Sequence, residues 1–300
     1  MRGDDEYSEV VVEPHLSVVI PCRNAEATIG EQLEALAREQ WDEPWEVVVS
    51  DNGSADATRA IVAGFAARLP GLRVVDSSDV RGPAHAMNVG AGAARGPLIA
   101  FCDADDVIGK GWLRAMGEAL GTHPFVAAAQ ETRRLNPDWI SETRQSIDGV
   151  LPEAKFPPHH TYAGAGTIGI RKDTHQSIGG FDSELGALFE IDYALRLRKV
   201  GIVPTLVPSA IVHYRWRRRL RDIYGQALWY ADGRALVEKR YAPAKATPRR
   251  IVRWLAAGWS EVLAQVPQLT RKGGRAKMAW LLGWQVGRLC AAVRHRVLVV

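Results

Sequence analysis

Short apolar runs alternate with longer helical patterns through the first two hundred residues, and this alternation restricts the fold more than any other feature. Five runs are short and rich in β-branched or aliphatic side chains, as buried strands are. They are residues 16–20, 46–50, 72–75, 97–102 and 125–130. Most of the segments between them carry apolar side chains at helical spacing. Repeated strand–helix–strand units predict an α/β fold with a mostly parallel sheet flanked by helices.

Polar residues come directly after three of these predicted strands. Arg23 and Asn24 follow the first strand, Asp51 and Asn52 follow the second, and residues 103–106 follow the fourth. The carboxyl ends of parallel strands lie at one edge of a sheet, where ligands bind in such folds. We therefore expect the three segments to deliver polar side chains to one site.

The fourth predicted strand runs into Asp103-Ala104-Asp105-Asp106, which places three carboxylates in one turn. They repel one another unless a cation lies between them, and oxygen ligands of this kind suit Mn²⁺ or Mg²⁺. Asp103 and Asp105 are the predicted metal ligands, and His213, which follows another apolar run, is a third candidate. A solvated loop is the alternative for the acids, and burial in the core is the alternative for His213.

A second acidic spot, Glu190 and Asp192, opens a predicted helix over residues 191–200. Attack by a hydroxyl group requires a carboxylate base within hydrogen-bonding reach. Acidic residues also favour helix N-termini for electrostatic reasons alone. Either residue is a candidate catalytic base.

Several segments together resemble the family 2 glycosyltransferases, which adopt the GT-A fold. The resemblance spans residues 16–213. Its parts are SVVIPCRN at 17–24, the stretch 46–58 containing DNGSADAT, residues 82–90, residues 94–106, GGFD at 179–182, and residues 195–201. Each part is modest, whereas their order and spacing are specific.

The resemblance implies an inverting transfer of a hexosyl group from a nucleotide-diphosphate sugar, most often a UDP-sugar, to an acceptor hydroxyl. Asp103 and Asp105 match the DxD pair of the family, and residues 179–182 would border the acceptor. The residues implied in nucleotide-sugar binding are Pro21, Arg23, Asp51, Asn52, Asn88 and Asp103.

The chain departs from the family pattern at two positions. The family places its base six residues before an arginine, and counting back from Arg196 gives Glu190 where Asp is expected. Asp192 therefore stays a competing candidate. Met87 replaces an arginine that commonly precedes the matched Asn88, which removes one cation near the donor.

Charge divides the chain into an acidic body and a basic tail. Residues 215–300 contain 19 Lys and Arg against 4 Asp and Glu, a net charge of +15, and six of the ten Trp. We predict a flexible acidic arm over residues 1–13, a catalytic domain over 14–214 and a helical extension over 215–300. The extension favours an anionic membrane surface as a partner over nucleic acid. Packing of its Trp and Leu side chains on the catalytic domain is the alternative.

The few cysteines and the absence of an apolar signal segment near Met1 predict a cytoplasmic protein, either free or peripheral on the inner face of the membrane. The acceptor should contact residues 132–162, and lipid-linked and polysaccharide acceptors both stay open. The rival interpretation is a catalytically weak protein of the same fold, recruited to a polyanionic partner by its tail.

Residues 164–169 match the pattern G-x-G-x-x-G. A dinucleotide site of this type requires a strand before the first glycine. A Pro- and His-rich stretch precedes it here, so we do not expect a dinucleotide site.

Overall fold

The computed structural model of the chain describes residues 13–141, 148–154, 159–241 and 247–297. Its centre is an eight-stranded sheet of order β3-β2-β1-β4-β7-β6-β8-β5. Neighbouring strands run parallel from β3 to β4 and between β6 and β8, whereas β7 and β5 are antiparallel to their neighbours. The predicted α/β architecture is confirmed. The strands are β1 (Leu16–Cys22), β2 (Trp45–Asp51), β3 (Arg73–Asp76), β4 (Leu98–Phe101), β5 (Val107–Ile108), β6 (Phe125–Glu131), β7 (Ile168–Arg171) and β8 (Thr205–His213).

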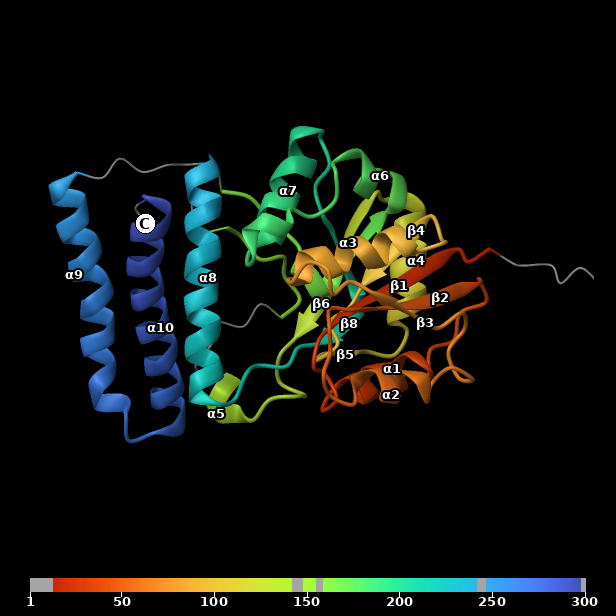
Figure 1. The fold of residues 1–300 in the computed structure, drawn as a ribbon, viewed down its shortest axis with the longest axis horizontal. Coiled ribbons are helices and arrows are strands. Elements are labelled where there is room, and N and C mark those ends of the chain that lie inside the picture. The colour runs from red at the N-terminus through yellow and green to blue at the C-terminus, as the bar shows by residue number, and fades with distance from the viewer. Residues whose placement is uncertain (1–12, 142–147, 155–158, 242–246, 298–300) are drawn as a thin grey trace, which may run out of the picture.

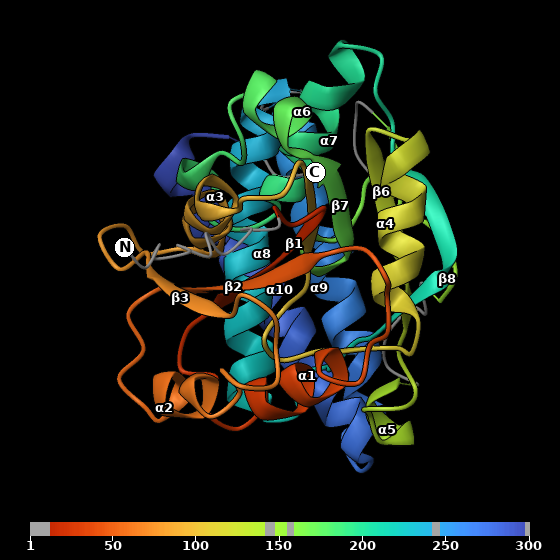
Figure 2. The same ribbon diagram turned by 90° about the vertical axis from the view of Figure 1, so that its right-hand side faces the viewer.

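Helices cover both faces of the sheet (Figures 1 and 2). One core joins the sheet to α1 (Ile29–Leu36), α2 (Thr58–Ala63) and α4 (Trp112–Thr122). The other joins it to α3 (Pro83–Ala93) and α7 (Phe189–Lys199). Successive side chains of a strand point to opposite faces, so adjacent residues of β1 enter different cores, and burial on both sides explains its continuous apolar run. Two further short helices are α5 (Asp138–Ser141) and α6 (Lys172–Ser177), and the 3₁₀ turns are η1 (Ala165–Thr167), η2 (Ser183–Leu185) and η3 (Val266–Gln268).

The strand register brings the predicted polar segments to one edge. Cys22 at the end of β1 lies opposite Asp51 at the end of β2, and Asp51 lies opposite Asp76 at the end of β3. Val19 of β1 lies opposite Phe101, so the turn at residues 103–106 leaves the sheet at the same edge.

Three long helices form a separate layer beside the sheet: α8 (Leu220–Tyr241), α9 (Pro248–Gln265) and α10 (Lys272–His295). In Figure 1, α8 stands next to the sheet, α9 lies at the far edge, and α10 lies between them. Small residues allow α10 to approach α8 closely. A Cβ at Gly283 would meet the Tyr224 carbonyl oxygen, and one at Gly287 would lie 2.8 Å from the Ala231 Cβ. The prediction of a C-terminal helical region is confirmed.

Replacement of Gly283 by Ala should destabilise the protein, because the added methyl group has to displace backbone of α8. Overpacking of this kind costs about 1–3 kcal/mol. Gly225→Ala on α8 is the matched control: nothing lies within 4 Å of the added Cβ, and Ala is favoured over Gly in a helix by about 0.5–1 kcal/mol. Urea unfolding measures both, and equal stability of the two variants would contradict the close packing of α10 on α8.

Candidate functional site

A cleft of about 500 Å³ opens at the carboxyl edge of β1, β2 and β4. Pro21 and Arg23 line it after β1, Asn52 lines it after β2, and Asp103 and Asp105 line it after β4. These five residues were predicted from sequence to lie at one site, and the parallel register brings them together.

The carboxylates of the Asp103–Asp106 turn have different surroundings. Asp103 is partly buried, and its pKa is raised to about 7 by burial first and then by the charges of Asp105 and Glu190. Asp105 is exposed in the cleft. Asp106 is buried and accepts a hydrogen bond from the Arg215 backbone N–H at 2.8 Å, so it serves the structure of the turn.

Arg215 holds this turn from the other side. Its guanidinium donates a hydrogen bond to the Asp105 carbonyl oxygen at 2.8 Å and forms an ion pair with Glu31 of α1 at 2.6 Å. The segment after β8 therefore fixes the position from which Asp103 and Asp105 face the cleft.

Glu190 lies in the first turn of α7 and faces the same region as Asp103. Burial raises its pKa to about 7, and its charge contributes to the raised pKa values of Asp103 and Tyr162. Leu188, which precedes α7, has a φ of +59°, a left-handed conformation that bulky residues rarely adopt. Backbone strain of this kind gathers at functional sites, and here it sets the direction in which α7 begins.

The structure does not position Asp192 as a base, which corrects one of the two predicted candidates. Its side chain is fully buried, and both oxygens are engaged. One accepts from Arg196 at 2.7 Å, and the other accepts from Arg240 at 2.9 Å and from the Tyr241 hydroxyl at 2.6 Å. Arg240 also pairs with Asp182 at 2.6 Å, so these ion pairs connect α7 and α8 to the turn at residues 179–182.

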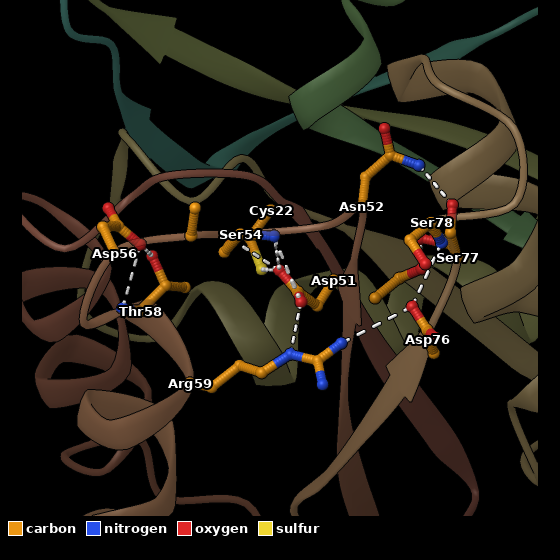
Figure 3. Close-up of polar contacts among 12 residues, drawn as sticks. Cys22, Asp51, Asn52, Ser54, Asp56, Thr58, Arg59, Asp76, Ser77 and Ser78 are labelled. Atoms are coloured by element: carbon orange, nitrogen blue, oxygen red, sulfur yellow. Dashed lines mark hydrogen bonds and ion pairs between the residues drawn. The ribbon is translucent and has the colours of Figure 1, made fainter.

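Asp51, expected in the nucleotide pocket, is instead a buried anchor for the loop after β2 (Figure 3). Its carboxylate accepts hydrogen bonds from Ser54 and Arg59 and from the Cys22 thiol. Burial raises the pKa of Asp51, but the bonds from Ser54 and Arg59 outweigh it and hold the pKa below its usual value.

Asn52 both reaches the cleft and organises its wall. Its amide group donates to the carbonyl oxygens of Ser77, as Figure 3 shows, and of Val80 at 2.8 Å, while its oxygen accepts from the Gly82 N–H at 3.0 Å. It therefore positions the loop that carries Arg81, a cleft residue that the sequence analysis missed.

The nucleotide-binding prediction for Asn88 is not supported by its contacts. Its amide oxygen accepts from the Phe181 N–H at 2.8 Å, and its amide nitrogen donates to the Phe181 carbonyl oxygen at 2.8 Å. Asn88 thus attaches α3 to the turn at residues 179–182. The neighbouring Met87 is fully buried and does not line the cleft.

His213 is not placed as a metal ligand, because both ring nitrogens are engaged elsewhere. Nδ1 lies 2.7 Å from the Glu131 carboxylate, and Nε2 lies 2.8 Å from the Arg134 guanidinium. Arg donates only, so it occupies the ring lone pair that a metal would need. The alternative of a satisfied, largely buried histidine is the one observed.

Two cleft residues come from beyond the predicted domain boundary at residue 215. Arg217 and Trp229 line the cleft together with Asp103 and Asp105. Both lie in the predicted extension, because the alternation of strand and helix patterns stops near residue 215. The cleft therefore crosses that boundary, and α8 belongs to its wall.

Residues 17–179, more than half of the chain, match the family model described as Glycosyl transferase family 2. The chain belongs to the family 2 glycosyltransferases. A validoxylamine A glucosyltransferase of Streptomyces hygroscopicus subsp. limoneus is 49% identical over 57 residues, 19% of this chain and 13% of that protein. A pre-mycofactocin glycosyltransferase of Mycobacterium tuberculosis is 28% identical over 153 residues, 49% of this chain and 28% of that protein. The matches thus span less than a third of either relative's length.

Solved glycosyltransferases share the fold of this family member. The mannosyltransferase PcManGT from Pyrobaculum calidifontis, in complex with GDP-Man and Mn²⁺, has a TM-score of 0.64 and 20% identity, over 94% of this chain and 88% of that one. Residues 1–349 of S. aureus TarS in complex with UDP-GlcNAc give a TM-score of 0.53 and 17% identity, over 94% and 92% of the two chains.

Asp103 and Asp105 of this glycosyltransferase fit a metal that is held partly by its substrate. Among the described residues, no group of three or more His, Cys, Asp or Glu side chains is arranged to hold an ion. Mg²⁺ is commonly bound through one or two carboxylates together with substrate phosphates. Burial first, and then the charges of Asp105 and Glu190, raise the pKa of Asp103, and a divalent cation would favour its ionised form.

In metal-free protein, Asp103→Asn should raise thermal stability at pH 8 but not at pH 4. The usual pKa of 3.8 applies to the unfolded chain, and the folded value is about 7, so wild-type stability falls as the pH rises from 4 to 7. The amide cannot ionise and avoids this loss, and each 1 kcal/mol of stability so retained raises Tm by about 2–4 °C. Unfolding in excess chelator measures the effect, and fully exposed Asp42→Asn is the control. An equal difference at both pH values would contradict the assignment.

Proposed function

We propose that the chain catalyses inverting transfer of a hexosyl group from a nucleoside-diphosphate sugar to an acceptor hydroxyl. One observation carries the proposal: Asp103 and Asp105, at the end of β4, line the cleft, and Glu190 at the start of α7 lies near enough for its charge to contribute to the raised pKa of Asp103. Such a transfer needs both a place for the diphosphate charge and a carboxylate base.

The donor would lie along the carboxyl edge of the sheet. Pro21, Arg23 and Asn52 would contact the nucleotide, and the cleft cations Arg81 and Arg217 would face the diphosphate. A Mn²⁺ or Mg²⁺ ion held by the two aspartates would supply Lewis-acid stabilisation of the leaving diphosphate. A UDP-sugar is the donor we propose, with a GDP-sugar as the alternative, because the similar PcManGT structure contains GDP-Man and Mn²⁺.

Glu190 is the proposed base. Its pKa of about 7 allows it to be ionised near neutral pH and still accept a proton effectively. As the acceptor oxygen forms a bond to the anomeric carbon, its proton moves to the Glu190 carboxylate and the bond from that carbon to the diphosphate breaks. Attack from the face opposite the leaving group inverts the anomeric centre.

The acceptor would bind next to Glu190. Burial raises the pKa of Tyr162, and the charge of Glu190 raises it further, so an aromatic side chain lies near the proposed base. Of residues 132–162, predicted to contact the acceptor, 142–147 and 155–158 lie outside the described residues. Lipid-linked and polysaccharide acceptors both offer the required hydroxyl.

An anionic membrane surface is the second partner that we propose, on the basis of the +15 net charge of residues 215–300. Among the helices that the structure describes, none combines the length and the apolar character required to cross a bilayer.

Purified protein with Mn²⁺ should slowly hydrolyse its donor, tested as UDP-glucose, UDP-GlcNAc and GDP-mannose, with release of the nucleoside diphosphate. Asp105→Ala should abolish turnover and weaken donor binding, since it removes one of the two carboxylates at the proposed diphosphate site. Full activity in excess chelator would exclude the metal. Tight donor binding without turnover in the presence of acceptors would favour the rival, a catalytically weak binding protein.

Glu190→Gln should lower kcat by about 10²–10⁴-fold, the usual contribution of a general base. Donor affinity should be nearly unchanged, because the nucleotide contacts lie on β1 and β2. Asp192→Asn is the informative comparison: it should lower Tm, because it weakens the ion pairs that Arg196 and Arg240 form with this fully buried carboxylate. If a stable Asp192→Asn variant lost glycosyl transfer while Glu190→Gln kept it, the catalytic base would be Asp192.

A further inference from the structure

An exposed side of α9 carries a stripe of apolar side chains. Val252, Ala256, Trp259 and Leu263 recur at intervals of three or four residues, which places them on one side of the helix. Val266, the first residue of η3, follows at the same spacing. The exposed fractions are 65% for Val252, 69% for Leu263 and 50% for Val266. Isolated exposed apolar residues are ordinary, but a continuous row of them indicates a contact surface.

This stripe is distinct from the side of α9 that packs on α10. Val262 clusters with Met278 and Leu281, and Gly258 allows α9 to approach Gln285. Gly258 and Val262 lie about a third of a turn around the helix from the stripe, at 100° per residue. Figure 1 shows α9 at the edge of the molecule with α10 on its inner side. The helix thus has two apolar sides, and the described structure covers one of them.

Cations lie at both ends of the stripe. Arg249 and Arg253 are exposed in the first turns of α9, and Arg271 and Lys272 are exposed just beyond its end. Residues 247–297 contain ten Lys and Arg and a single acidic residue, Glu261. Glu261 is half a turn around the helix from Val252, so it does not interrupt the stripe.

We propose that the α9 stripe inserts into the interface of an anionic membrane, with the flanking cations at the level of the lipid phosphates. Apolar insertion combined with basic residues is the pattern by which amphipathic helices bind such surfaces. The inference rests on the membrane partner proposed above and is independent of the transfer reaction. A second copy of the chain fits less well, because in either orientation of paired α9 helices the basic ends would face basic ends.

Flotation of the full chain with vesicles tests the surface directly. Wild type should float with phosphatidylcholine vesicles containing phosphatidylglycerol and stay unbound with phosphatidylcholine alone. The double variant Val252→Glu/Leu263→Glu should bind at least about tenfold more weakly, because it removes apolar insertion. Ala257→Glu/Ala264→Glu is the matched control, since it adds the same charge at exposed positions on another side of α9.

Clearly stronger binding by the control than by the stripe variant supports insertion. An equal loss in both variants would show that charge alone binds the protein and would overturn the proposal. A wild-type dimer in vesicle-free solution that the stripe substitutions convert to a monomer would identify a second copy as the occupant and would equally overturn it. Donor hydrolysis without vesicles should be unchanged in both variants. Failure of hydrolysis in wild type would count against the proposed transferase and leave the vesicle result intact.

Discussion

Burial raises the pKa of Asp103 and of Glu190 to about 7, and the charges of Asp105 and Glu190 raise the pKa of Asp103 as well. Carboxylates in such surroundings cost free energy when they are charged, and nothing in the packing of a core requires them. The sheet register, the strained Leu188 before α7 and the turn after β4 all act to keep these groups close. The fold therefore maintains a concentration of negative charge that a cationic or proton-donating ligand would relieve, which is the arrangement expected of a site that accepts such ligands.

Two arginines outside the family match of residues 17–179 hold this arrangement in place. Arg215 binds the turn that carries Asp103 and Asp105, and Arg240 binds the buried side of α7, the helix that carries Glu190. Neither needs to touch a substrate to matter, because each fixes the backbone from which an acid projects. The first C-terminal helix therefore takes part in forming the site: α8 lines the cleft with Trp229 and holds α7 through Arg240.

The sequence was sufficient to predict five of the eight strands, β1 to β4 and β6, and the edge at which their polar residues meet, because both follow from local periodicity and parallel pairing. The three strands that it did not predict, β5, β7 and β8, form all the antiparallel pairings of the sheet. It was insufficient for the roles of individual polar side chains. An Asn amide, a His ring and a carboxylate bind ligands through the same atoms that form hydrogen bonds and ion pairs within the protein. Asn88 forms hydrogen bonds with Phe181, 93 residues away in the sequence, and Asp192 forms an ion pair with Arg240, 48 residues away. Partners at such separations are set by tertiary packing, which a local pattern does not contain.

The glycines of residues 164–169 are a second case in which a local sequence pattern does not reveal what a residue does in the fold. Their spacing matches a phosphate-binding fingerprint, but the structure gives them another purpose. A Cβ at Gly166 would overlap the Asp103 carboxylate, and one at Gly169 would lie 2.6 Å from Val126. The segment lies against β4 and β6 because its backbone can approach where a side chain cannot. At Gly166 the segment lies directly against the Asp103 carboxylate, so it limits the positions that this side chain can adopt. Glycine at position 166 is therefore required by the acid site and not by a dinucleotide.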